Sequence, residues 1–259
     1  MAASPARIVC LTEEPTEILY LLGEQDRIVG ISAYTVRPPE AKRDKPVVSA
    51  FVDGSVRKIK ALAPDLVIGY SDVQAELAAK LIRENLQVLI LQQHSLEEIL
   101  GTILLMGRLV GREASARELA REYRARLDAA RVRTEASVAR PRVYFEEWPD
   151  PLLCGGGWVS ELVQIAGGED VFTDRASNRK AMERAVTSEE VIERAPDVML
   201  ASWCGKPFES DVPRSREGWA AIPAIRHDRV HEIDSSIILQ PGPGALTVGL
   251  DALEAILRA

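Results

Sequence analysis

Ala63-Pro64-Asp65-Leu66-Val67-Ile68 is echoed in the second half of this 259-residue chain by Ala195-Pro196-Asp197-Val198-Met199-Leu200. In each copy, a proline closes a helical pattern and an apolar run typical of a buried strand follows the aspartate. A residue type that caps helices stands nine residues before each proline, Ser55 in the first copy and Thr187 in the second. Each copy therefore predicts a capped helix followed directly by a strand.

Two further pairs of segments repeat in the same order. Arg7-Ile8-Val9 corresponds to Arg142-Val143-Tyr144, and the segment 21–26, LLGEQD, corresponds to the segment 165–170, IAGGED. Three matches in one order indicate an internal duplication. We therefore expect two similar lobes.

The first half of the chain alternates short β-rich runs with amphipathic helical patterns. This alternation predicts parallel βα units, in which helices cover the faces of a sheet. The strand-like runs are residues 7–11, 27–31, 66–70 and 88–91, and the helical segments are residues 15–22, 56–63 and 74–85.

A different kind of segment joins the two halves. Ser95 and Glu98 have the spacing of a capping box that opens a helix reaching Val110. Residues 113–137 contain no proline or glycine, and a helix of this length would span roughly 37 Å. The predicted fold is two α/β lobes with parallel-type sheets, joined by one long backbone helix, with a ligand cleft between the lobes. The expected divisions are residues 1–94, 95–138 and 139–259.

Composition and charge exclude several classes of protein. Hydrophobic residues make up 46% of the chain and charged residues 27%, as in ordinary globular proteins. The net charge of −7 disfavours a nucleic-acid partner. No apolar run approaches the roughly 20 residues of a membrane span, and Met1–Arg7 lacks the features of a secretion signal. We expect a cytoplasmic monomer, or an extracytoplasmic one if the sequence is a processed form.

Sequence motifs for catalysis and metal binding are missing. There is no HExxH, paired-cysteine or clustered-histidine spacing, and no nucleophile elbow, phosphate-binding loop or dinucleotide fingerprint. Glu13-Glu14 and Glu146-Glu147 are adjacent pairs, and neighbours on a strand point to opposite faces, so neither pair forms an acid–base dyad by itself. The sequence therefore assigns no catalytic residue and no metal ligand.

Ligands of α/β sheets bind beyond the carboxyl ends of the strands, so the loops after each strand supply the candidate site. Three of the four tryptophans fall in these loops, and flat aromatic surfaces suit a planar or macrocyclic ligand, although each indole could instead pack its own loop. Cys204 could be a soft metal ligand or a buried spectator thiol, and Lys206 would suit a ligand carboxylate or phosphate. The candidate ligand-binding residues are Glu13, Tyr34, Phe51, Tyr70, Trp148, Trp158, Trp203, Cys204, Lys206 and Gln240.

Three segments carry a resemblance to a known family. They are Arg7–Tyr34 (RIVCLTEEPTEILYLLGEQDRIVGISAY), Val56–Gly69 (VRKIKALAPDLVIG) and Arg142–Asp174 (RVYFEEWPDPLLCGGGWVSELVQIAGGEDVFTD). Together they resemble the helical-backbone class of periplasmic binding proteins, which deliver siderophores, haem and cobalamin to ABC importers. The likeness covers nearly the whole chain and is greatest to the cobalamin-binding members. It implies a binding protein without a built-in cofactor that captures a large chelate.

The resemblance also implies a partner. Members of the family dock on an ABC permease through an acidic residue near the start of one equivalent helix in each lobe. Glu189 matches this position in the second lobe, whereas Arg57 stands at the equivalent place in the first. Three hypotheses stay open: an importer component, a cytoplasmic carrier or sensor of the same ligand, and an enzyme that acts on a cofactor precursor through Cys204 or a carboxylate.

Overall fold

The computed structural model describes residues 4–135 and 140–258. The chain folds into two compact units, which we call unit 1 and unit 2. Unit 1 comprises Met1–Gln93 and Glu97–Tyr123, and unit 2 comprises His94–Leu96 and Arg124–Ala259. Each unit is built around its own sheet with flanking helices, which confirms the predicted two-lobed α/β fold.

Unit 1 contains a parallel sheet of five strands in the order β3-β2-β1-β4-β5. Four of its strands coincide with the predicted runs. The three-residue strand β3 was not predicted, because Val47-Val48-Ser49 is too short for a clear pattern and pairs only at the edge of the sheet. The strands are β1 Ile8–Cys10, β2 Ile28–Ser32, β3 Val47–Ser49, β4 Leu66–Tyr70 and β5 Val88–Leu91.

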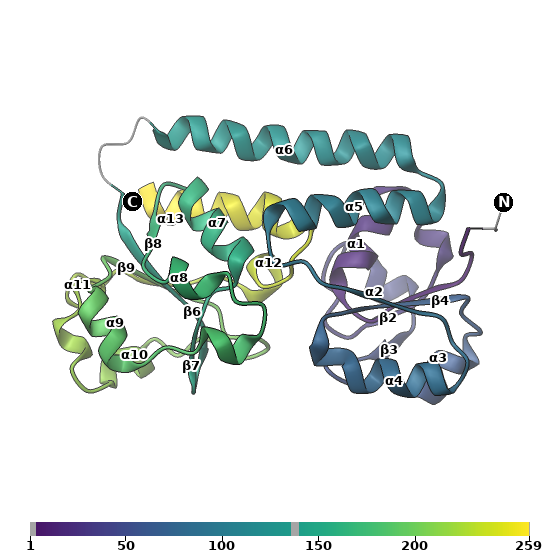
Figure 1. Cartoon of the computed structure of the whole chain (residues 1–259), viewed down its shortest axis with the longest axis horizontal. Coiled ribbons are helices and arrows are strands. Elements are labelled where there is room, and N and C mark those ends of the chain that lie inside the picture. The colour runs from purple at the N-terminus through teal and green to yellow at the C-terminus, as the bar shows by residue number, and fades with distance from the viewer. Residues whose placement is uncertain (1–3, 136–139, 259) are drawn as a thin grey trace. The chain divides into compact units, whose positions relative to one another are not determined.

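Helices cover both faces of this sheet. In Figure 1, α1 and α5 lie on one side of the strands of unit 1, and α3 and α4 lie on the other. The Ser55 hydroxyl caps α3 by accepting a hydrogen bond from the Lys58 backbone amide at 3.3 Å, as predicted. The helices are α1 Glu13–Leu21, α2 Ala41–Asp44, α3 Val56–Ala61, α4 Ala75–Arg83 and α5 Leu96–Val110, with 3₁₀ turns at Gln25–Arg27 and Asp72–Gln74.

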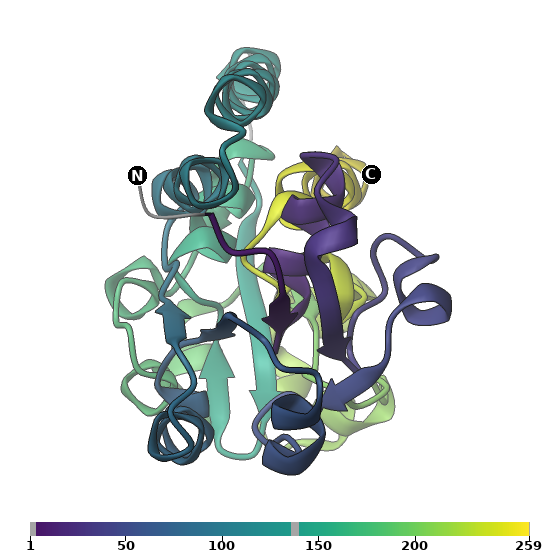
Figure 2. The same cartoon turned by 90° about the vertical axis from the view of Figure 1, so that its right-hand side faces the viewer.

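The long helix α6 spans Glu113–Glu135, close to the predicted residues 113–137. Its first part packs on α5 in unit 1, and both helices are seen end-on in Figure 2. A Cβ atom added at Gly107 would lie 2.3 Å from the Ala116 Cβ, so glycine allows the close approach of the two helices. Gly111 makes the turn between them with a φ of +73°.

Unit 2 contains a mixed sheet in the order β10-β9-β6-β7, with β8 paired to β6. The pairs β10–β9, β9–β6 and β6–β8 are parallel, as expected, and β7 runs antiparallel to β6. The physical reason is the proline-rich turn at residues 149–151, which returns the chain directly along β6. The strands are β6 Arg142–Pro149, β7 Leu152–Cys154, β8 Glu169–Asp170, β9 Val198–Ala201 and β10 Val230–Glu232.

Helix α9 of unit 2 begins with a complete capping box. The Thr187 hydroxyl accepts from the Glu190 amide at 3.2 Å, and the Glu190 carboxylate accepts from the Thr187 amide at 2.8 Å. The helices are α7 Gly157–Ile165, α8 Thr173–Ala176, α9 Ser188–Arg194, α10 Asp211–Ser215, α11 Pro223–Arg226, α12 Ser235–Ile238 and α13 Leu250–Arg258, with 3₁₀ turns at Ala181–Arg184 and Trp219–Ala221 and a π-helix at Ala245–Gly249.

The duplicated motif has the same hydrogen bonds in both units. The Asp65 carboxylate accepts from the Arg7 backbone amide at 3.0 Å, and the Asp197 carboxylate accepts from the Arg142 amide at 2.9 Å. In each unit the guanidinium of that arginine donates to a carbonyl at the end of the helix before the aspartate. The aspartate that precedes β4 or β9 therefore holds the start of β1 or β6, respectively, in place. The repeat seen in the sequence is thus also a repeat in the structure.

Candidate ligand-binding site

Two aromatic side chains meet beyond the carboxyl ends of the strands of unit 1. Tyr34 follows β2 and is 46% exposed, and its ring packs edge-on against Phe51, with 6.4 Å between the ring centroids. Tyr70 ends β4, is buried, and donates its hydroxyl to the Gln93 carbonyl at 3.1 Å. The structure therefore brings Tyr34 and Phe51 together and assigns Tyr70 to the packing beneath the loops.

A buried ion pair joins α1 to the segment that follows β2. Glu13 forms an ion pair with Arg37 and accepts from the Val36 amide at 3.0 Å, and Arg37 also contacts Glu17 at 3.2 Å. Burial raises the pKa of Glu13 to about 8, against the opposing effect of the Arg37 charge. Glu13 lies in the first turn of α1, so treating it as a strand residue was wrong; the helix begins two residues earlier than its pattern suggested.

Glu14 lies next to this pair and is also buried. Neither of its carboxylate oxygens has hydrogen-bond geometry to a protein group in the described residues. Burial raises its pKa, and the nearby Thr12 hydroxyl offsets part of that rise. Burial therefore favours the neutral carboxylic acid at this position.

Unit 2 places a carboxylate with several hydrogen-bond donors in β6, opposite the carboxyl end of β9. Glu146 is fully buried and accepts from the Trp203 indole N–H at 3.0 Å, from the Arg216 guanidinium at 2.6 and 3.0 Å, and from the Tyr144 hydroxyl at 3.2 Å. The guanidinium stacks on the ring of Trp219, 4.4 Å from its centroid. One carboxylate thus joins residues from three separate segments of unit 2.

The adjacent Glu147 is held by a different arginine. Both of its oxygens accept from Arg184 at 2.8 Å, and Arg184 also donates to the Cys154 carbonyl at 3.3 Å. Burial raises the pKa of the Cys154 thiol to about 12. The pKa of the Cys204 thiol is also raised, mainly by burial and to a smaller extent by the negative charge of Glu147. Both thiols therefore stay protonated near neutral pH, which does not favour a nucleophilic role.

Trp148 lies in β6 and not in a loop, and Trp203 and Lys206 belong to the segment that follows β9. The Lys206 ammonium sits 4.4 Å from the centroid of the Trp148 ring, whose N–H donates to the Asp150 carbonyl at 2.8 Å. Trp203 is 5% exposed and packs edge-on against Phe208, with 5.1 Å between centroids. A cavity of about 450 Å³ adjoins this group and is lined by Trp203, Gly205, Lys206, Pro207, Glu232, Ile233, Asp234 and Ser235.

Two other predicted residues have contacts of a different kind. Trp158 lies in the first turn of α7, is buried, and donates its indole N–H to the Ile238 carbonyl at 2.8 Å. Gln240 is half-buried, and its backbone carbonyl accepts from the Gly242 amide at 2.8 Å. A role in ligand binding remains a prediction for both.

Sequence reasoning missed the arginines that hold these carboxylates. Arg216 is 70 residues from Glu146, and Arg184 is 37 residues from Glu147. No local spacing links partners so far apart in the chain. Alternation along β6 could have shown only that the two glutamates need different partners.

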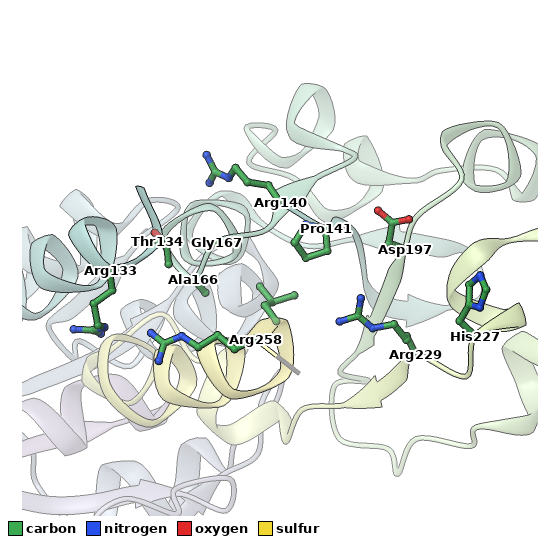
Figure 3. Close-up of a pocket in the computed structure, with 11 residues that line it drawn as sticks. Arg133, Thr134, Arg140, Pro141, Ala166, Gly167, Asp197, His227, Arg229 and Arg258 are labelled. Atoms are coloured by element: carbon green, nitrogen blue, oxygen red, sulfur yellow. The ribbon is translucent and has the colours of Figure 1, made fainter. Parts of the chain in front are cut away.

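A second cavity of about 830 Å³ lies at the other end of the unit 2 strands (Figure 3). It borders the start of β9 and β10 and the ends of α6 and α13, so it is not at the carboxyl ends where ligands of such sheets bind. Its arginines include Arg133 and Arg258, which both pair with Glu254. The cavity is lined by Arg133, Thr134, Arg140, Pro141, Ala166, Gly167, Asp197, His227, Arg229, Leu257 and Arg258.

The two residues expected to dock on a partner both lie in the first turn of a helix. Glu189 in α9 is exposed, and hydrogen bonds from its own backbone amide and from the Thr187 hydroxyl lower its pKa. Arg57 in α3 is exposed next to Lys58. The two helices therefore present opposite charges, as their sequences indicated.

Within residues 4–135 and 140–258, no group of three or more His, Cys, Asp or Glu side chains is arranged to hold a metal ion. None of the helices described there is long and apolar enough to cross a membrane.

Comparison with known proteins gives concordant results. A family model described as periplasmic binding protein matches residues 8–237. The chain is 31% identical to the vitamin B12-binding protein of Vibrio campbellii, over 93% of this chain and 86% of that protein. It is 25% identical to the uncharacterised ABC transporter substrate-binding lipoprotein YvrC of Bacillus subtilis, over 92% of this chain and 76% of that protein.

A solved structure agrees with these sequence matches. The apo form of the periplasmic heme-binding protein RhuT from Roseiflexus superposes with a TM-score of 0.80 at 27% identity, covering 97% of this chain and 98% of that one. The similarity therefore extends over both units.

Proposed function

The chain belongs to the periplasmic binding protein family and is a substrate-binding protein of the ABC-importer type, and on this premise we propose that its ligand is a corrinoid such as cobalamin. Its ligand is cargo, and the protein carries no built-in cofactor. The similarity to vitamin B12-binding proteins supports this choice. The charges of the side chains at the strand ends also favour a corrinoid, as the next paragraph explains.

The arginines at the strand ends of each unit are already paired with carboxyl groups. In unit 1, Arg37 pairs with Glu13 and Glu17, and burial favours the neutral acid at Glu14. In unit 2, Arg184 and Arg216 are already neutralised by Glu147 and Glu146, and the nearby cavity adds two more carboxylates beside Lys206. Such surroundings repel a ligand with several free carboxylates and accept a neutral or cationic one. Cobalamin carries amide side chains and fits this condition.

Haem is the second candidate, and Lys206 favours it. This ammonium lies over the Trp148 ring, and within the described residues it has no carboxylate partner. It could pair with a propionate of a haem that stacks against the neighbouring aromatic rings. The two candidates differ in charge, so they can be separated by experiment.

The test is competitive titration of the purified protein with cyanocobalamin, the cationic corrinoid cobinamide, haemin and a ferric siderophore, followed by tryptophan fluorescence and calorimetry. We expect both corrinoids to bind at least tenfold more tightly than haemin. Lys206→Gln should leave cobinamide affinity within about twofold, because cobinamide carries no phosphate or carboxylate with which this ammonium could pair. If haemin binds more tightly than the corrinoids and Lys206→Gln abolishes this preference, haem and not a corrinoid is the ligand.

We further propose that the protein works outside the cytoplasm with an ABC permease. The relatives described above are named as a lipoprotein and as a periplasmic protein, so the comparisons do not support the cytoplasmic location expected from the start of the sequence. They also weaken the carrier hypothesis, which relied on that location. Enzymatic action is excluded by membership of a family of binding proteins.

The contact with the permease is proposed to be asymmetric. In unit 1, the first turn of α3 carries Arg57 and Lys58. In unit 2, α9 carries Glu189 and Glu193, and all four side chains are exposed. Charge complementarity across an interface directs association and fixes orientation. A partner with an acidic surface for α3 and a basic surface for α9 would therefore bind in one orientation only.

A further inference from the structure

We infer that Glu146 and Arg216 act as positioning residues for Trp203, and that the orientation of this indole sets the affinity for the ligand. This inference rests on the proposed function, because it takes Trp203, which lines the cavity of about 450 Å³, as a ligand contact. Neither Glu146 nor Arg216 lines that cavity. They act through the indole and not through the ligand.

The geometry around the Trp203 ring leaves it little freedom. Its N–H donates to one Glu146 oxygen at 3.0 Å, and its ring packs edge-on against Phe208. The indole N–H is the only polar atom of this buried side chain, and a buried donor without an acceptor costs about 1–3 kcal/mol. The Glu146 oxygen therefore selects the orientation in which the indole lines the cavity.

Arg216 makes this acceptor possible. Glu146 is fully buried, and a buried carboxylate without a counter-charge would change its protonation or draw in water. Two guanidinium hydrogen bonds at 2.6 and 3.0 Å neutralise it, and stacking on Trp219 holds the guanidinium in place. Removing Arg216 should thus release Trp203, although the two side chains share only Glu146.

The experiment labels the protein with 5-fluorotryptophan and records the fluorine NMR spectrum, in which Trp203→Phe identifies the Trp203 resonance. Glu146→Gln and Arg216→Gln should shift or broaden that resonance without ligand and weaken cobalamin binding at least tenfold. Arg216→Lys keeps the charge but loses the bidentate geometry, so its effects should be smaller than those of Arg216→Gln.

The matched control is Glu254→Gln in α13. Glu254 is likewise a buried carboxylate held by two arginines of unit 2, Arg133 and Arg258, but it lies at the opposite ends of the strands. It should lower stability without moving the Trp203 resonance or the affinity.

An unchanged Trp203 resonance in folded Glu146→Gln or Arg216→Gln protein overturns the inference, as does equal loss of affinity in Glu254→Gln. If the parent protein binds no corrinoid, the proposed ligand is wrong. The fluorine spectrum then still decides whether Glu146 and Arg216 position the indole.

Discussion

At the scale of single residues, the structure concentrates unusual features at the ends of the strands. Ala63 and Ala195 adopt left-handed φ angles of +45° and +42° at equivalent places in the two units, where the chain turns from a helix into a strand. Beyond the strands, Glu13, Glu14 and Glu146 are buried carboxyl groups. Glu146 accepts hydrogen bonds from a guanidinium, an indole and a hydroxyl, whereas neither Glu14 oxygen has hydrogen-bond geometry to a protein group in the described residues.

Glu14 should make the stability of unit 1 depend on pH in an unusual direction. Its folded pKa is raised, so the folded state holds a proton that the unfolded state releases above pH 4.5. The contribution of this proton to the free energy of unfolding is fully present below pH 4.5, and it is lost as the pH rises through the pKa of Glu14 in the folded state. Glu14→Gln should therefore lose less stability than the parent protein between pH 5 and 8.

Urea unfolding at pH 5, 6, 7 and 8 measures this difference. Glu84→Gln, which removes an exposed carboxyl group paired with Lys60, should retain the pH dependence of the parent protein. A Glu14→Gln curve parallel to that of the parent would show that Glu14 is charged in the folded protein.

At the scale of elements, glycine decides how closely two helices pack. Gly107 faces Ala116 where α5 turns into α6, whereas a Cβ atom at Gly101 in the same helix would meet no atom within 4 Å. Gly107 therefore allows α5 and α6 to pack closely, whereas Gly101 only leaves an exposed helix position without a side chain.

Gly107→Ala should destabilise unit 1 by about 1–3 kcal/mol, because the added methyl group overlaps Ala116 and the backbone carbonyl of Arg112. Gly101→Ala should stabilise it by up to about 1 kcal/mol through helix propensity alone. Thermal and urea unfolding of both variants measure the two effects. Equal changes of the same sign would contradict close packing at Gly107.

At the scale of the whole molecule, the two units share a fold but differ in surface charge. Both contain the aspartate that ties one strand to the next, and both begin a helix after a capping residue. Their exposed first turns carry cations in α3 and carboxylates in α9. A duplicated scaffold has therefore acquired two unlike surfaces for partners.

Arg57→Glu should slow association with the cognate permease in nanodiscs by about tenfold at low salt, because it reverses the charge that an acidic permease surface would attract. Glu189→Arg should have a similar effect on the other side of the contact. Ligand affinity should not change in either variant. Faster association of Arg57→Glu would instead indicate a permease that presents basic surfaces to both helices.

Periodicity and duplication in the sequence alone determined the two α/β units, four strands of unit 1, the long helix and the caps at Ser55 and Thr187. These features depend on neighbours within a few residues, so their patterns are visible along the chain. Only the tertiary structure decided the pairing of Glu146 with Arg216 and the burial of Trp203. Side-chain partners 57 to 70 residues apart leave no local pattern, because packing of the whole unit selects which groups meet.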